Sequence, residues 1–161
     1  MPVVTRDGIK EGYVNTFGIK HDELPPDING RVTDLFFEIV NIYLEGDVSL
    51  VIEAAFQHHV WEPRLPNILK AAETSFVICT VDDSLAASRA IERGLKDPER
   101  EFYHGDNRVV HFKKTGELLT PAPYKTPAFD LPTIEVKTHG EYDPSLDEIV
   151  ARLRSRDAGT N

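Results

Sequence analysis

The sequence predicts an α/β fold in which parallel strands alternate with helices. Short runs of β-branched and aromatic residues without polar alternation are typical of strands buried in a parallel sheet. Runs of this kind occupy residues 3–4, 49–52, 76–81 and 133–136. Segments with helical spacing of apolar residues separate these runs, which is the rhythm of β–α–β units. Together the two observations favour a parallel sheet covered by helices.

Each helix is indicated by apolar residues that recur three or four positions apart. The expected helices span residues 30–45, 60–72, 83–94 and 144–154. In the second of these, Pro66 predicts a late start or a kink, because proline disrupts the interior of a helix. Asp143 is expected to cap the last helix, since an aspartate side chain accepts hydrogen bonds from the first free amides.

Two segments lack both periodicities. Residues 18–29 carry a proline pair and are expected to form a loop, and residues 96–132 are longer and rich in proline. A loop of that length in a compact domain is usually functional, for example as a lid. We therefore expect one domain over residues 1–155 with a lid-like insertion at about 96–132, followed by a disordered tail at 156–161.

Composition narrows the functional classes. The 161 residues carry a formal net charge of −9, which opposes broad binding to nucleic acid, although basic residues cluster between positions 89 and 114. No apolar run approaches the ~20 residues of a membrane span, and a cytoplasmic location is expected. The single cysteine, Cys79, lies in an apolar run and is expected to be an inert core thiol.

The first strand delivers three charged residues to its carboxyl end, where open α/β sheets bind ligands. They are Arg6, Asp7 and Lys10. Asp7 is a candidate general base toward a substrate hydroxyl, and Arg6 or Lys10 could hold a phosphate or another anionic group of the substrate. The structural alternative is that Asp7 caps a helix that begins at Gly8.

Further charged residues follow the later strands. Glu53 comes directly after a predicted buried strand, where a carboxylate is costly unless it is used, hydrated or paired. It could hold magnesium-bound water, bind substrate, or form a structural salt bridge. Arg89, Arg93 and Arg100 lead from a helix into the long segment, where mobile arginines could reach phosphates. Their alternative is a solvated basic face.

The sequence predicts no metal site. His58 and His59 cannot both ligate one ion from a regular helix, because adjacent side chains diverge by about 100°. His104 and Asp106 form a loop pair without a third ligand in the sequence around them. Trp61 is expected to pack in the core rather than to stack on a base.

The order and spacing of five segments resemble a known family. The segments are Val4–Gly12, Ser49–Phe56, Cys79–Asp82, Arg93–Asp106 and Pro132–Thr138. Together they resemble bacterial P-loop kinases labelled AAA-family ATPases, close to the polynucleotide-kinase, chloramphenicol-phosphotransferase and zeta-toxin branches. The resemblance covers nearly all of residues 2–153. It implies a three-layer P-loop NTPase-like parallel sheet with helices on both faces.

The resemblance also implies roles for particular residues. Asp7 matches the catalytic or substrate-orienting aspartate, Lys10 a basic contact to substrate phosphate, and Glu53 an acidic residue beside the substrate. Arg93 matches a catalytic arginine in a lid over the phosphates of ATP. Among residues that would bind the cofactor, Arg89 and Arg100 match the same lid, and Thr138 would lie near adenine. ATP and Mg²⁺ are the implied cofactors, and the phosphate acceptor is a small molecule or, less favoured by the net charge, a polynucleotide end.

The sequence departs from this family at the donor side. No Gly-x-x-x-x-Gly-Lys-Ser/Thr motif occurs in the 161 residues. The first strand, the phosphate loop and the first helix of such kinases are therefore expected to be missing, through a trimmed sequence or a misassigned start. Because that first strand is central, its loss would leave two unpaired inner edges and an apolar slot.

Three functional hypotheses follow from the sequence. The first is an ATP-dependent phosphotransferase that is inactive in this form, without its ATP-anchoring segment. The second is a non-catalytic relic that binds a nucleotide or a partner, with homodimerisation through open sheet edges as one route. The third is a nucleotidyltransferase or hydrolase of another α/β class, which the absence of a Ser-His-Asp order disfavours.

Overall fold

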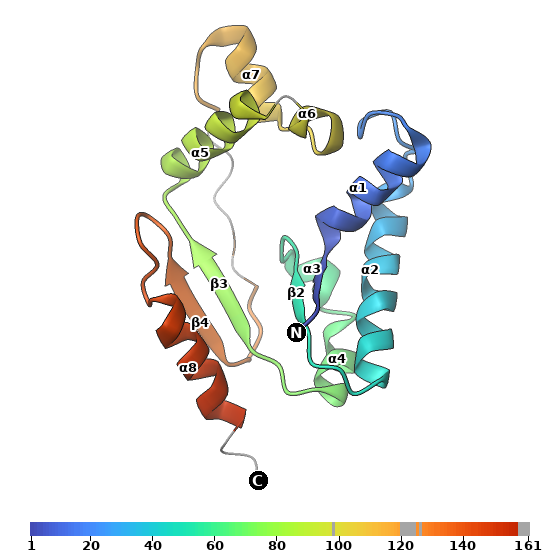
Figure 1. Cartoon of the computed structure of the whole chain (residues 1–161), viewed down its shortest axis with the longest axis vertical. Helices are drawn as coiled ribbons and strands as arrows, with labels where there is room; N and C mark the ends of the chain where they lie inside the picture. The colour runs from blue at the N-terminus through green and yellow to red at the C-terminus, as the bar shows by residue number, and fades with distance from the viewer. Residues whose placement is uncertain (98, 120–124, 126, 158–161) are drawn as a thin grey trace.

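The computed structural model describes residues 1–97, 99–119, 125 and 127–157 (Figure 1). Within these residues the strands are β1 (Val3–Thr5), β2 (Val51–Glu53), β3 (Phe76–Thr80) and β4 (Thr133–Lys137). They form two parallel pairs, β1 with β2 and β3 with β4. The α/β class with parallel strands is thereby confirmed, but the expected sheet is divided into two pairs among the described residues.

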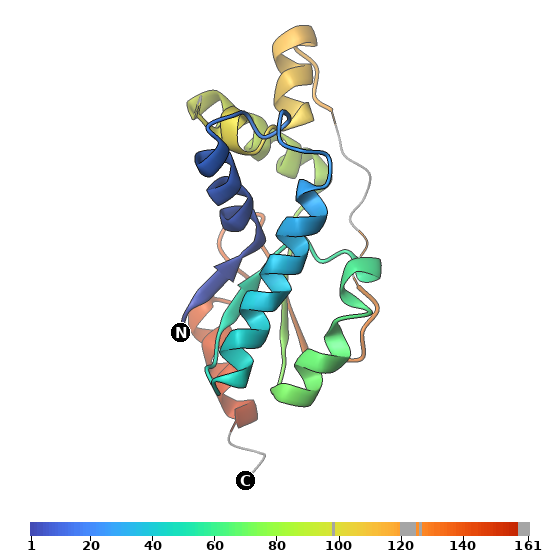
Figure 2. The same ribbon diagram turned by 90° about the vertical axis from the view of Figure 1, so that its right-hand side faces the viewer.

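The β1–β2 pair packs against long helices on one side. Helix α1 (Arg6–Phe17) follows β1 directly, and α2 (Ile28–Glu45) runs alongside it (Figures 1 and 2). Two short helices, α3 (His58–Trp61) and α4 (Leu65–Ala71), replace the single helix expected over 60–72. The interruption falls at residues 62–64, which include Pro63, and Pro66 lies in the first turn of α4, which is the late start that the sequence predicts.

An aromatic core holds this half together. Trp61 is 2% exposed and its ring stacks on Phe56 with centroids 4.0 Å apart. Phe36 and Phe37 of α2 meet the indole edge-to-face. Phe56 also contacts Phe76 at the start of β3, with ring centroids 5.0 Å apart. This aromatic contact therefore links the two strand pairs, although no ladder joins them.

The β3–β4 pair is covered by α8 (Leu146–Asp157), whose Ile149 packs on the buried Ile134 and Val136. The predicted cap of this helix was wrong. Ser145 precedes the helix, and its hydroxyl accepts a hydrogen bond from the Glu148 amide, while the Glu148 carboxylate accepts from the amide and the hydroxyl of Ser145, which is a capping box. Helix α8 continues to Asp157, beyond the expected start of the tail, and residues 158–161 lie outside the described residues.

The lid-like segment contains helices. After α5 (Asp83–Lys96), the chain forms α6 (Arg100–Tyr103) and α7 (Asn107–Thr115) at one end of the molecule (Figure 1). Gly94 of α5 lies against Val109 of α7 so closely that a Cβ on Gly94 would overlap its side chain. Asp106 caps α7 by accepting a hydrogen bond from the Arg108 amide. Residues 98, 120–124 and 126 of the predicted insertion lie outside the described residues.

The strands are less buried than the sequence predicts. Val51 of β2 is 44% exposed, Val77 of β3 is 43% exposed, and Cys79 is exposed rather than a core thiol. Val3 is 61% exposed and lies beside Val51 in the ladder, so both point to the same face. In a parallel sheet both faces are normally covered. Here β2 and β3 lie next to each other without pairing (Figure 1). Apolar side chains of both pairs are left open to solvent.

Candidate functional site

The start of α1 sets the position of the predicted catalytic residues. Thr5 ends β1 in an extended conformation, and its hydroxyl accepts a hydrogen bond from the Gly8 amide at 3.1 Å. Thr5 is therefore the helix cap, and the alternative that Asp7 caps α1 is wrong. Asp7 lies in the first turn and is exposed, and Lys10 follows it three residues later on the same helix face.

These residues line a pocket of about 230 Å³ between α1 and the segment from α5 to α7. Arg6, Asp7 and Lys10 line it from α1, and Arg100 and His104 line it from the lid-like segment. Residues expected in two different roles, substrate and ATP phosphate binding, thus share one pocket. The carboxyl end of β1 opens into it, as the strand-end rule predicts.

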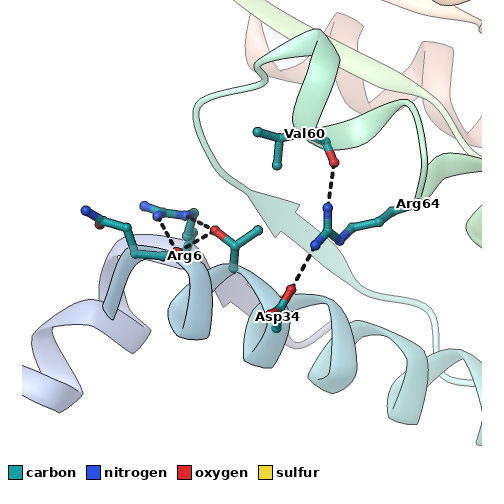
Figure 3. A network of polar contacts seen from close by, with 6 residues as sticks. Arg6, Asp34, Val60 and Arg64 are labelled. Carbon is teal, nitrogen blue, oxygen red and sulfur yellow. Dashed lines mark hydrogen bonds and ion pairs between the residues drawn. The ribbon is translucent and has the colours of Figure 1, made fainter. Parts of the chain in front are cut away.

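Arg6 is tied to α2 at the edge of this pocket. Its Nε donates to Thr33 Oγ1 at 3.2 Å, and a terminal guanidinium nitrogen donates to the Asn29 carbonyl at 3.3 Å (Figure 3). Nearby, Arg64 donates to Asp34 at 2.8 Å and to the Val60 carbonyl at 3.1 Å, which fastens the turn before α4 to α2. Both arginines therefore hold α2 in place.

Helix α6 is docked on α1 by polar contacts. His104 Nε2 lies 2.5 Å from Glu11 Oε1, and the Tyr103 hydroxyl donates to Asn15 at 3.0 Å. The His21 amide, in the loop before α2, donates to the Phe102 carbonyl at 2.9 Å. These contacts close the pocket on the side of the lid-like segment. Sequence reasoning missed the His104–Glu11 pair, since it read His104 only beside Asp106.

Several charges around the pocket are already paired. Hydrogen bonds from the Arg108 guanidinium to the Asp106 carboxylate lower the pKa of that carboxyl. A hydrogen bond from Lys113 lowers the pKa of Glu101. Burial lowers the pKa of His21, which favours its neutral imidazole. Asp106 and Glu101 therefore stabilise the walls of the pocket, and their carboxylates are not free to bind a ligand.

A second group of predicted residues meets at the carboxyl end of β4. The Arg89 guanidinium donates to the Thr138 carbonyl at 2.6 Å and to the His139 carbonyl at 2.9 Å. Arg93 is exposed one turn further along α5, and its Nε donates to the Arg89 carbonyl at 3.3 Å. Arg89 and Thr138, both expected to bind the cofactor, are therefore in contact.

Glu53 belongs to neither group. It is exposed at the end of β2 and does not line the pocket, and the strand that carries it is itself partly exposed. The desolvation cost that singled it out in the sequence is therefore small.

The chain fits ATP and Mg²⁺ only in part. Arg93 and Arg100 are suited to phosphate oxygens, but the 161 residues offer no glycine-rich loop of backbone amides to hold them. Within the described part of the chain, no three His, Cys, Asp or Glu residues are grouped to hold a metal ion. Magnesium is often held by one or two carboxylates together with the phosphates of the substrate. None of the described helices is long and apolar enough to cross a membrane.

Comparison with known proteins finds likeness in the fold. No family model matches the chain, and no curated protein matches its sequence. The crystal structure of a "putative kinase" from Chloroflexus aurantiacus aligns with a TM-score of 0.66 at 15% sequence identity. The alignment covers 96% of this chain and 83% of that protein, so part of that protein has no counterpart here. The likeness shows that the chain has a kinase-like α/β fold.

Proposed function

We propose that the protein is the acceptor-side part of an ATP-dependent phosphotransferase of the P-loop kinase class. The observation that carries the proposal is the pocket that Asp7, in the first turn of α1, lines together with Lys10 and Arg100. A carboxylate beside two cations is the arrangement that phosphoryl transfer uses on its acceptor side. The kinase-like fold of the Chloroflexus aurantiacus protein supports the same class.

In this mechanism the hydroxyl oxygen of the acceptor forms the new bond to phosphorus, and Asp7 accepts the proton of that hydroxyl. Lys10 and Arg100 hold the acceptor, and the segment from α6 to His104, docked on α1 through His104 and Glu11, forms one wall of the pocket. Bound ATP with Mg²⁺ would supply the phosphoryl group and depart as ADP. Arg93 is exposed on α5 next to Gly94, which lines the pocket, and its charge would stabilise the oxygens of the transferred group.

The donor side is proposed to lie between β2 and β3. The unpaired edges and the exposed Val51, Val77 and Cys79 are what a sheet shows when a central strand and a covering helix are not in place. A strand, a phosphate loop and a helix in that position would join the two strand pairs into one sheet and complete a three-layer fold. The phosphate loop of this unit would also place backbone amides between the pocket beside Asp7 and the contact of Arg89 with Thr138.

The test compares two forms of the protein. The 161-residue chain should give no ATP-dependent thermal shift, because it lacks the phosphate loop. The same chain fused after a strand–phosphate loop–helix unit should bind ATP and transfer labelled γ-phosphate to an acceptor from a panel of hydroxylated compounds. A clear ATP-dependent shift for the 161-residue chain would overturn the proposed donor side. Absence of transfer by an ATP-binding fusion would overturn the phosphotransferase itself.

A second function is favoured by the exposed apolar side chains of the two strand pairs. Val3, Val51 and Val77 are each more than 40% exposed, and exposed apolar surface commonly binds a partner. On this account the protein is non-catalytic and its open strand edges pair with another chain, for instance in a homodimer. Sedimentation at micromolar concentrations discriminates the two: a stable dimer that shields Cys79 favours this function, and a monomer favours the first.

A further inference from the structure

The pocket beside Asp7 contains more charged groups than it has internal partners. Arg6 is bound to α2, Asp106 to Arg108, and His104 to Glu11. Glu101 is paired with Lys113 at 3.0 Å. The Asp106–Arg108 pair stabilises the start of α7, and the other contacts hold neighbouring elements together. These side chains are therefore engaged before any ligand arrives, and Arg6, whose partners are uncharged, keeps its positive charge.

Three lining side chains remain without such a commitment. Within the described residues, no hydrogen bond or ion pair reaches the side chains of Asp7, Lys10 or Arg100. Lys10 and Arg100 are only partly exposed, so each is held at the pocket wall rather than extended into solvent. Lys10 comes from α1 and Arg100 from α6, so the two cations face the pocket from opposite elements. One carboxylate and two cations leave the free lining with a net positive charge.

We propose that Lys10 and Arg100 together bind a phosphomonoester group of the acceptor, which is a small hydroxylated molecule that already carries one phosphate. The inference rests on the proposed function and assigns its acceptor class. Arg100 thereby acts on the acceptor, not on the phosphates of ATP as the resemblance implies. Guanidinium and ammonium groups form charge-assisted hydrogen bonds with phosphate oxygens, whereas Asp7 repels them. The acceptor is oriented with its phosphate at the two cations and its hydroxyl at Asp7.

The size of the pocket limits the acceptor. Pockets for drug-sized ligands are typically about 300–1,000 Å³. At about 230 Å³, this one suits a phosphate on a short carbon skeleton and excludes a polynucleotide end from full burial. The protein has a net charge of −9, so most of its surface repels anions. A cationic pocket on such a protein therefore binds anions selectively at that one place.

Direct binding to the 161-residue chain tests this inference without any phosphotransfer. Isothermal titration with glycerol 3-phosphate should show binding that weakens with added salt, and the uncharged analogue glycerol should not bind. Arg100→Ala and Lys10→Ala should each raise the dissociation constant about tenfold or more, and Arg100→Lys should raise it less. Lys70→Ala, at an exposed lysine on α4 away from the pocket, should leave it unchanged. Matching far-ultraviolet circular dichroism spectra establish that the variants are folded.

The outcomes separate this inference from the proposed function. Equal binding of glycerol and glycerol 3-phosphate, or affinity that is indifferent to both substitutions, would overturn the phosphomonoester assignment. If the fusion protein then phosphorylated an uncharged acceptor in an Asp7-dependent manner, the proposed function would stand without it. Conversely, binding that depends on Lys10 and Arg100 in a protein that never transfers phosphate would support the anion site and overturn the kinase.

Discussion

Gly105, in the turn between α6 and α7, lies directly against the imidazole ring of His21 in the loop before α2. A Cβ on Gly105 would overlap that ring, and the residue also has a φ of +54°, which side chains other than hydrogen rarely tolerate. The turn therefore brings the lid-like segment and the loop before α2 into contact on the same side of the pocket as His104.

Gly105→Ala should lower the free energy of unfolding by about 1–3 kcal/mol, because it adds both backbone strain and the overlap with His21. Gly116→Ala is the matched control, since Gly116 has a φ of +73° but no atom near its missing side chain. Urea denaturation should show the larger loss at Gly105, and adding His21→Ala should recover part of it. Equal losses at the two glycines would contradict the contact.

The contact with His21 also predicts a pH dependence. Burial is the largest influence on His21 and lowers the pKa of its imidazole below 6.5, the usual value. The stabilisation from the neutral ring is therefore fully present above pH 6.5 and declines as the pH falls through the window below it. The nearby charged groups that add to or oppose this effect are Lys10, Lys20, His104 and Asp22. Melting temperatures at pH 7.5 and 5.5 should differ more for the wild type than for His21→Gln, and an equal difference would remove His21 from this role.

The aromatic core should dominate the stability of the β1–β2 half. Trp61→Ala removes a side chain that is 2% exposed and contacts three phenylalanine rings, so it should cost about 3–5 kcal/mol. Leu69→Ala on α4, where the side chain is 40% exposed, is the control and should cost far less. Chemical denaturation measures both. A small effect at Trp61 would mean that this core is not the stabilising one.

Cys79 should react as an accessible thiol in the folded protein. Because the face that carries it is uncovered, a thiol reagent should label native and urea-unfolded protein at comparable rates. Fusion to the strand–phosphate loop–helix unit should slow the native reaction strongly. A thiol in the 161-residue chain that reacts only after unfolding would show that the face is already covered.

Parts of the fold were predictable because they depend on local sequence. The parallel strands and the long helices α2, α5 and α8 follow from periodicity alone. The burial of the strands was mispredicted because it also depends on what covers the second face of the sheet. The apolar run around Cys79 does not indicate whether that face is covered. The cap at Ser145 was missed because Asp143 offered a cap of its own, and only the reciprocal bond to Glu148 distinguishes the two.

The part of the candidate site that lies at the carboxyl end of β1 was predictable. Asp7 and Lys10 were identified from their place after β1, and they do share a pocket. The pairing of His104 with Glu11 could not be predicted, because it depends on how α6 docks on a helix distant in sequence. The same docking brings Arg100 into the pocket that Asp7 lines, whereas the sequence alone places Arg100 only in a long proline-rich segment.

The central claim is that Asp7 is the general base of a phosphotransferase, and the Asp7→Asn variant of the ATP-binding fusion protein tests it most directly. Single-turnover transfer of labelled γ-phosphate should fall by about 10²–10⁴-fold, since a positioned base contributes that much, while ATP affinity is unchanged. Asp147→Asn, at an exposed aspartate on α8, should retain full activity. Equal losses of transfer and ATP affinity in Asp7→Asn, or no loss of transfer, would contradict the claim.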